Sequence, residues 1–326
     1  MKREFWLSWM VIFAFGLFWI GEGPVSQASA AEPLHFGYLV ADQLHSPGPM
    51  IMKEKGFLKE EGFEVKWSEF LAGAYAMQHF SAGEVDVVSC GAVPMMIARG
   101  SGTNVVMIAS ANTEGSALVV VPEVKAVKDL QGQKVGSPGL GSIQDAMLSM
   151  VERQHNIRIL HVPIKVSDMP IYLNKKEIKG FISWEPHCSR AVDMGYGKIL
   201  LTSHDMLPNH QCCVVAVQGK MIKENPAKVK RIMKAYLRAL DYANKNREET
   251  VKLMAKYTNL SDAVVKAALP IVKNPYPPFV DKESLKVMGQ LLMDTGKIEK
   301  DKVPDLNKLI AEVYNETFLK EAIGGK

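Results

Sequence analysis

The sequence has little cysteine: its 326 residues contain four, at positions 90, 188, 212 and 213. Four cysteines in an exported chain of this length do not form the dense framework of a small disulfide-stabilised domain. One bridge, from Cys188 to Cys212 or Cys213, is compatible with an oxidising compartment, and buried unbridged thiols are the alternative. The spacing does not decide between the two.

Strong charge is also missing. Lys and Arg total 39 while Asp and Glu total 35, which gives a net charge of +4. The basic residues form no run and are not interleaved with aromatic residues, and this pattern argues against a nucleic-acid partner. The weak basic excess is compatible with an anionic ligand without requiring one.

The common catalytic motifs are absent as well. The stretch "GLGSIQ" begins at Gly139 like a dinucleotide-binding fingerprint, but Gln144 stands where the third glycine is needed. The sequence contains no G-x-x-x-x-G-K-[ST], no G-x-S-x-G and no H-E-x-x-H. We therefore predict a protein that is not an enzyme and that carries no cofactor.

The N-terminus carries a clear signal. Lys2 and Arg3 precede an apolar run at residues 5–20, and a small-residue exit follows at residues 28–30. This order is typical of a secretory signal peptide, so we predict cleavage after Ala30 and a periplasmic or secreted mature protein. A membrane anchor is the alternative, but the run is short for the roughly 20 residues that a span needs.

The remaining chain alternates between β-prone runs and helical patterns, which is typical of an α/β domain with a mainly parallel sheet. The first set of predicted strands is 34–40, 63–70, 85–91 and 104–111, and the second set is 133–138, 161–167, 178–186 and 197–203. The predicted helices lie between them, at 48–62, 74–84, 93–102, 142–156, 170–177 and 187–195. Two further extended runs, 116–122 and 211–218, join the sets, and an amphipathic helix begins at Pro226.

We therefore predict an α/β protein with two lobes, in which the two extended runs are hinge strands. Lobe one comprises residues 31–119 and 215–326, and lobe two comprises residues 120–214. In open α/β sheets, ligands bind beyond the carboxyl ends of the strands. Two lobes that face one another would place those ends around a single ligand cleft.

Loops that follow the predicted strands carry glycine, hydroxyl and amide residues, and several of them open directly into helices. Free backbone N–H groups and the helix dipole make such junctions suited to anionic or strongly polar groups. Trp184 ends one strand, where it is either a platform for the ligand or a core residue. The predicted ligand-binding residues are Gln43, His45, Ser46, Gly73, Ala74, Gly91, Ala92, Asn112, Gly141, Ser142, Gln144, Trp184 and Glu185.

A denser group of potential metal ligands occurs between residues 187 and 213. The group consists of His187, Cys188, His204, His210, Cys212 and Cys213. Such ligands suit a transition metal, but no C-x-x-C pair is present, and adjacent cysteines in a strand point to opposite faces. We predict no metal ligand and keep a transition-metal binder as an alternative.

Five segments together resemble a known family. They are "GYLVADQLHSPGPMIMKEKGFLKEEGFEVKW", "HFSAGEVDVVSCGAVPMMIARGSGTNVVMIAS", "DLQGQKVGSPGLGSIQD", "GFISWEP" and "MIKENPAKVKRIMKAYLRAL". They resemble the substrate-binding proteins of ABC importers in the nitrate, sulfonate and taurine group, which share their fold with thiamine-pyrimidine synthases. The resemblance implies a type II periplasmic binding protein that closes on a small polar or anionic organic solute. It also implies delivery to an ABC permease and ATPase complex at the inner membrane, and we expect a monomer.

The resemblance has departures. Cys90, His187 and the Cys212-Cys213 pair are not general features of that group. The solutes that members of the group bind are therefore not assigned to this chain from the resemblance alone. Nitrate, sulfonates, taurine and pyrimidine-like compounds all remain open. Two other functions also remain open: a pyrimidine synthase, which in the fold's relatives uses a cofactor lysine, a histidine and a cysteine-rich segment, and a sensory solute-binding module.

Overall fold

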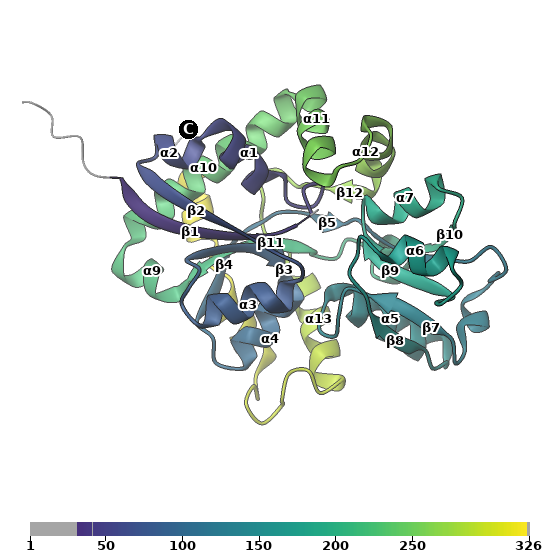
Figure 1. The fold of residues 1–326 in the computed structure, drawn as a ribbon. Helices are drawn as coiled ribbons and strands as arrows, with labels where there is room; N and C mark the ends of the chain where they lie inside the picture. Colours follow the sequence, from purple (N-terminus) through teal and green to yellow (C-terminus); the bar gives the residue numbers. More distant parts are fainter. Residues whose placement is uncertain (1–30, 41, 325–326) are drawn as a thin grey trace, which may run out of the picture. The chain divides into compact units, whose positions relative to one another are not determined.

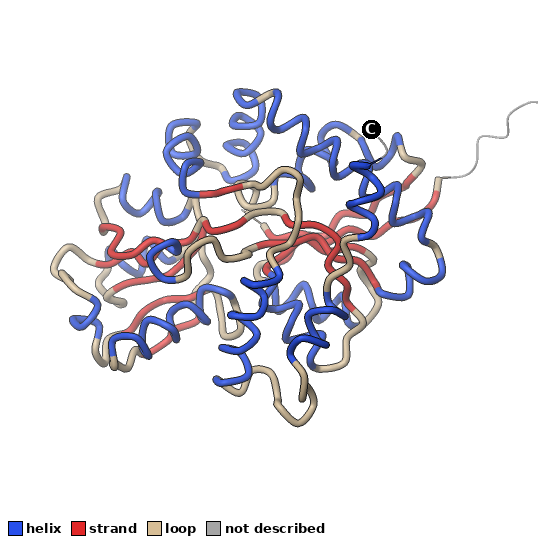
Figure 2. The backbone as a smooth tube through the Cα atoms, turned by 180° about the vertical axis from the view of Figure 1, so that it is seen from behind, coloured by secondary structure: helices blue, strands red, loops and turns tan. Residues whose placement is uncertain are grey.

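The computed structural model describes residues 31–40 and 42–324, so the predicted signal peptide lies outside the described residues. The described chain contains two five-stranded sheets and one two-stranded sheet. Figure 1 shows that helices cover both faces of the larger sheets, and Figure 2 shows the same arrangement from behind. Both sets of predicted strands are therefore present, in separate sheets.

The first sheet has the strand order β2-β1-β3-β11-β4. Its strands are β1 (Glu32–Leu39), β2 (Phe63–Phe70), β3 (Val87–Gly91), β4 (Val105–Ser110) and β11 (Cys213–Gln218). Strand β1 runs parallel to β2 and β3, whereas β11 runs antiparallel to both of its neighbours. Strands β3 and β4 are buried at every position, as expected for apolar runs covered by helices on both faces.

The second sheet has the order β10-β6-β9-β7-β8. Its strands are β6 (Ser116–Val120), β7 (Lys134–Ser137), β8 (Leu160–Pro163), β9 (Gly180–Trp184) and β10 (Lys198–Thr202). Here β6 is the antiparallel strand. The helices of this lobe are α5 (Ile143–His155), α6 (Met169–Asn174), α7 (His187–Asp193) and α8 (Ser203–Met206).

The first sheet carries most of the helices. Those that precede the crossing to the second sheet are α1 (Pro47–Lys55), α2 (Phe57–Glu60), α3 (Gly73–Ser81) and α4 (Ala92–Gly100). Those that follow the return are α9 (Gly219–Glu224), α10 (Pro226–Lys245), α11 (Arg247–Thr258), α12 (Asp262–Ala268), α13 (Lys282–Asp294), α14 (Leu306–Val313) and α15 (Thr317–Gly324). Within the described residues, no helix combines the length and apolar character that crossing a membrane requires.

Helix α10 shows how the C-terminal helices attach to the first lobe. Asn225 caps the helix by accepting a hydrogen bond from the Lys228 N–H, and Pro226 fits the first turn because its missing N–H is not needed there. The predicted apolar face, with Val229 and Tyr236 on it, is buried. A Cβ atom at Gly48 of α1 would lie 2.3 Å from the Tyr236 ring, so only glycine permits this close helix contact.

The chain crosses between the sheets twice. Strand β6 lies wholly in the second sheet and β11 wholly in the first, so the crossings occupy residues 111–115 and 207–212. A short sheet of β5 (Thr113–Glu114) and β12 (Val272–Lys273) lies at the first crossing. The two predicted hinge strands are therefore ordinary strands that pair within one sheet each. The sequence could not distinguish the two cases, because a β-prone run has the same pattern whether it bridges two lobes or pairs within one. Movement of the lobes about the crossings stays a prediction.

Candidate functional site

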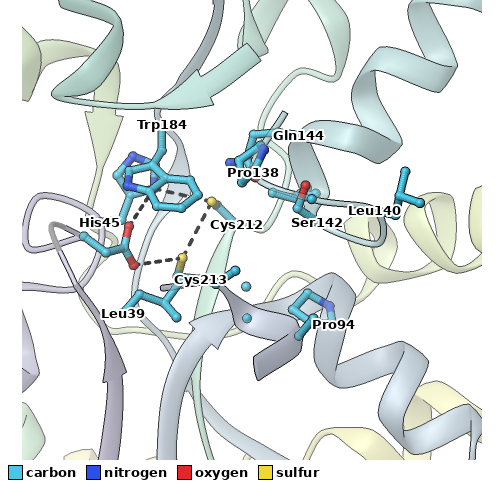
Figure 3. Close-up of a pocket in the computed structure, with 17 residues that line it drawn as sticks. Leu39, His45, Pro94, Pro138, Leu140, Ser142, Gln144, Trp184, Cys212 and Cys213 are labelled. Atoms are coloured by element: carbon cyan, nitrogen blue, oxygen red, sulfur yellow. Dashed lines mark hydrogen bonds and ion pairs between the residues drawn. The ribbon is translucent and has the colours of Figure 1, made fainter. Parts of the chain in front are cut away.

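A pocket lies between the two sheets, at strand ends and helix starts from both lobes (Figure 3). It encloses about 490 Å³ of unfilled space, including the part open to solvent. Seven predicted ligand-binding residues line it: His45, Gly73, Ala74, Gly91, Ser142, Gln144 and Trp184. The lining residues that the sequence analysis did not predict are Leu39, Asp42, Ala72, Pro94, Pro138, Gly139, Leu140, Ile143, Cys212 and Cys213.

The other six predicted residues do not line the pocket: Gln43, Ser46, Ala92, Asn112, Gly141 and Glu185. Several of them position the wall behind it. The Ala92 N–H donates to the Cys212 carbonyl oxygen at 2.8 Å, and the Glu185 carboxylate accepts from the Ser189 N–H at 3.0 Å. A single sequence cannot distinguish a residue that contacts the cleft from its neighbour that holds the loop.

Three helices begin at the pocket wall. Helix α3 follows Ala72 and helix α4 follows Gly91, and neither has a side-chain cap. Helix α5 follows Ser142, whose hydroxyl accepts from the Asp145 N–H at 3.1 Å. The positive ends of three helix dipoles therefore face one space, which favours a negatively charged or strongly polar group. Gly73 is required for this packing, since a Cβ atom there would lie 2.6 Å from Pro94 Cγ.

Trp184 contributes an aromatic wall. It ends β9, is 4% exposed and lines the pocket, so it is both a core residue and a pocket residue. Its ring lies edge-on to the His187 ring, with the centroids 6.1 Å apart and the planes at 77°. The sequence analysis treated core and platform as alternatives, whereas one large ring at a lobe boundary has surface for both.

His45 is fully buried and held in one orientation. Its Nε2–H donates to the Gly115 carbonyl oxygen at 2.9 Å, because a carbonyl only accepts. Its Nδ1 atom lies 3.1 Å from Asn112 Nδ2 and 3.4 Å from Cys212 Sγ. The Asn112 amide is itself fixed, since its Oδ1 accepts from the Cys213 N–H at 2.9 Å. Nδ1 of His45 is therefore directed toward the two cysteines.

Cys212 and Cys213 both present their sulfur atoms to this site. The sulfurs are 3.8 Å apart, and Cys213 Sγ donates to Asp42 Oδ2 at 3.6 Å. Opposite faces were expected only if both cysteines sat in a strand, and this condition is not met, because β11 begins at Cys213 and the alternation does not apply to Cys212. The only signal in the sequence for this site was that Cys212 and Cys213 are adjacent. No spacing links them to His45, which lies 167 residues before Cys212.

None of the four cysteines forms a disulfide, and all are buried. The bridge considered for Cys188 does not exist. Cys188 lies on α7 in the second lobe, where its thiol contacts the carbonyl oxygens of Ala117 at 3.5 Å and Ser183 at 3.3 Å. Buried thiols, the alternative considered, are what the structure contains.

Burial and mutual contact shift the ionisation of this group. Burial raises the pKa of Asp42 to about 7. The hydrogen bond from Cys213, together with the nearby His45, holds the pKa of Cys212 well below its usual range. Burial lowers the pKa of His45, but Cys212 outweighs this effect and raises the pKa to about 9.

The residues that could hold a metal differ from the predicted group. The structure brings His45, Cys212 and Cys213 together, with their donor atoms within 4.8 Å of one another. Asp42 lies beside this group, with Oδ2 3.6 Å from Cys213 Sγ, but does not share the 4.8 Å spacing with all three donors. His204 instead binds Glu114 at 2.5 Å. The sequence window from 187 to 213 therefore contained two of the donors, and the other two come from the loop after β1.

Comparisons with known proteins agree with this architecture. The aliphatic sulphonate binding protein of Escherichia coli has 22% identity and a TM-score of 0.69, with 82% of this chain and 94% of that chain covered. The nitrate-binding protein of Synechocystis PCC 6803 has 14% identity and a TM-score of 0.78, over 90% of this chain and 89% of that chain. A zinc-bound ligand binding component of an ABC-type import system from Staphylococcus aureus has 17% identity and a TM-score of 0.75, over 89% and 99%.

These likenesses confirm the predicted fold, the two-lobed type II fold of periplasmic binding proteins. The match to a family model is independent of them. The model described as the NMT1-like family covers residues 27–259, which is most of the chain and includes every residue of the pocket. The chain therefore belongs to the NMT1-like family.

Proposed function

We propose that this protein is the solute-binding component of an ABC importer. It captures a small polar or anionic organic solute between its lobes and delivers the solute to a membrane permease and its ATPase. The observation that carries this proposal is the pocket at which strand ends and helix N-termini of both lobes meet. Named relatives of the same fold support it, since they bind sulphonate or nitrate in the periplasm.

The pocket offers the solute two kinds of surface. The starts of α3, α4 and α5 provide backbone N–H groups for an anionic or strongly polar end. Trp184 and the apolar side chains of Leu39 and Pro94 provide a wall for a carbon skeleton or ring. A solute of nitrate, sulfonate or taurine type would use the first surface, and a pyrimidine-like solute would use both.

Capture depends on closure of the lobes. Lobe one supplies Gly73 and Gly91 and lobe two supplies Ser142 and Trp184, so a bound solute contacts both lobes only when they are together. A solute that binds the closed form more tightly shifts the population toward it. The closed form is then what the permease recognises, and no covalent step is needed.

The pyrimidine-synthase alternative receives no support from the lining residues. A pyridoxal cofactor is held through a Schiff base to lysine, and none of the residues that line the pocket is a lysine. The location proposed for the protein is the periplasm, where the relatives of the same fold named above act.

Tryptophan fluorescence tests the proposal. Residues 31–326 contain two tryptophans, Trp67 and Trp184, and only Trp184 lines the pocket. Titration with taurine, alkanesulfonates, nitrate and pyrimidines should give a saturable fluorescence change with one of them. The W67F variant should retain this change and W184F should lose it. A response that persists in W184F and disappears in W67F would place the solute outside the pocket and contradict the proposal.

A further inference from the structure

We propose that Asp42, His45, Cys212 and Cys213 bind a thiophilic divalent metal cation of the zinc class at the floor of this pocket. The inference deepens the proposed function and rests on it, because the cation becomes part of the captured solute.

Three of the separations between donor atoms match those of a tetrahedral site. With metal–sulfur bonds near 2.3 Å and metal–nitrogen bonds near 2.1 Å, a tetrahedron separates two sulfurs by about 3.8 Å and a sulfur from a nitrogen by about 3.6 Å. The sulfurs of Cys212 and Cys213 are 3.8 Å apart, and Cys212 Sγ lies 3.4 Å from His45 Nδ1. Cys213 Sγ lies 3.6 Å from Asp42 Oδ2, against about 3.5 Å in the same geometry.

His45 is oriented as a metal ligand. Its Nε2–H is committed to the Gly115 carbonyl oxygen, so Nδ1 carries the lone pair and lies 3.4 Å from Cys212 Sγ, and a bound metal would replace the Asn112 amide nitrogen as the partner of Nδ1. A metal-bound histidine almost always makes such a bond with its other ring nitrogen, since the bond fixes both the tautomer and the ring. Asn112 holds the backbone of Cys213 in the same manner, through Oδ1.

Asp42 supplies the third line of evidence. The residue is 2% exposed, and its Oδ1 atom has no hydrogen-bond partner among the described residues. A buried carboxylate oxygen without a donor is costly, and a cation removes the cost. No lysine or arginine lines the pocket, and the ion partner of Asp42 Oδ1 is His45 Nδ1 at 4.0 Å, itself one of the proposed metal ligands.

The donor set selects the cation. Two thiols, an imidazole and a carboxylate are the ligands of zinc and of other thiophilic metals, whereas Mg²⁺ and Ca²⁺ take oxygen ligands. The geometry therefore excludes a hard-cation site at this position. The competing reaction of this pair is oxidation of Cys212 and Cys213 to a disulfide, which would remove both sulfur donors.

The test uses residues 31–326, freed of metal and kept reduced. Zn²⁺ is measured by equilibrium dialysis against a competing chelator, and Co²⁺ is followed by its visible and sulfur-to-metal charge-transfer absorption. We expect one Zn²⁺ per chain and the absorption of tetrahedral, thiolate-bound Co²⁺. The double variant C212S/C213S should lose the charge-transfer band and at least about 100-fold in Zn²⁺ affinity.

Matched variants separate binding from folding. C188S also alters a buried thiol but lies in the second lobe, so it should bind Zn²⁺ as the wild type does. If C212S/C213S does not fold, D42N keeps the shape of the side chain and should weaken Zn²⁺ binding at least about tenfold. Binding that C212S/C213S and D42N both leave intact would overturn the proposal.

Three further outcomes have a fixed meaning. Failure of the reduced wild type to bind Zn²⁺ or Co²⁺ overturns the metal site, and a Trp184 response to an organic solute in that case leaves the proposed function standing. Zn²⁺ binding without any fluorescence response to the organic panel supports the metal site and contradicts the proposed capture of an organic solute. A mass decrease showing that Cys212 and Cys213 pair in air even with Zn²⁺ present also overturns the site.

Discussion

Nε2 of His45 donates a 2.9 Å hydrogen bond to the carbonyl oxygen of Gly115, a residue 70 positions further along the chain. Gly115 lies where the chain crosses from the first sheet to the second. The orientation of a pocket side chain in lobe one is therefore set by the segment that leads to lobe two. This contact couples the shape of the pocket to the connection between the lobes.

Substitution of Gly115 should break that coupling. The residue has φ +90°, and a Cβ atom there would lie 2.7 Å from His45 Nε2 and 3.0 Å from a Val272 methyl. We expect G115A to lower the free energy of unfolding by about 1–3 kcal/mol from backbone strain alone, with a further loss from the clash. The measurement is the melting temperature, together with Zn²⁺ affinity.

Gly132 provides the control for backbone strain. It has φ +68°, and a Cβ atom there has nothing within 4 Å. G132A therefore carries the strain without the clash and should leave Zn²⁺ affinity unchanged. Equal losses of melting temperature in G115A and G132A would show that the His45 contact adds nothing.

Glu114 makes the crossing sensitive to acid. Burial raises the pKa of Glu114, but bonds from His204, Lys273 and the Asn209 N–H outweigh burial and lower the pKa to about 2. Unfolding returns the pKa to about 4.3. The ionised carboxylate therefore contributes stability that is fully present above about pH 5 and is lost as the pH falls toward 2. The wild type should melt higher than E114Q at pH 7, and the difference should shrink in acid.

An exposed glutamate serves as the comparison for this pH effect. Glu123 also pairs with a lysine, at 2.9 Å from Lys176, but its side chain is 57% exposed. Exposed pairs contribute little to stability, so E123Q should match the wild type at pH 7 and in acid. A wild-type advantage over E114Q that stays constant from pH 7 to pH 3 would exclude ionisation as its origin.

Lys297 connects the lobes. It follows α13 on lobe one and binds the carboxylate of Asp145, a fully buried residue on α5 of lobe two. His161 binds the other carboxylate oxygen at 2.6 Å. Loss of the lysine removes a charged hydrogen bond that joins the two lobes, worth about 1.5–3 kcal/mol. K297M should therefore open the lobes, and small-angle scattering should record a larger radius of gyration than in the wild type.

Lys300 is the matched position for that experiment. Its ion pair, 3.7 Å to Asp294, is formed within lobe one, and its side chain is 62% exposed. K300M should leave the radius of gyration unchanged. A K297M protein as compact as K300M would mean that the Asp145 pair does not hold the lobes together.

The sequence pattern predicted the sheets well because local preferences and long-range pairing agree there. The run 63–70 coincides with β2, and residues 225–246 contain α10 with its cap at Asn225 and its buried face. The crossings were less predictable. Strand β6 is as β-prone as a bridging segment would be, and only its pairing with β9 and β10 places it in the second sheet.

The site was predictable only in part, because local patterns are visible in a sequence and the pairing of distant strands is not. Strand ends and helix starts are visible in a sequence, so Gly73, Ser142 and Trp184 were predicted and do line the pocket. The meeting of His45 with Cys212 depends on the order of strands in the first sheet, which places β11 beside β3. No spacing along the chain encodes that order.

The most direct test of the account is a thermal-shift screen of residues 31–326, with and without reductant. The panel contains sulfonates, taurine, nitrate, pyrimidines and divalent metals. A solute that binds only the folded protein raises the melting temperature by mass action. We expect a concentration-dependent rise with one member of the panel, and W184F or C212S/C213S should abolish that rise. A rise that both variants retain would contradict the claim that the pocket between the lobes captures the solute.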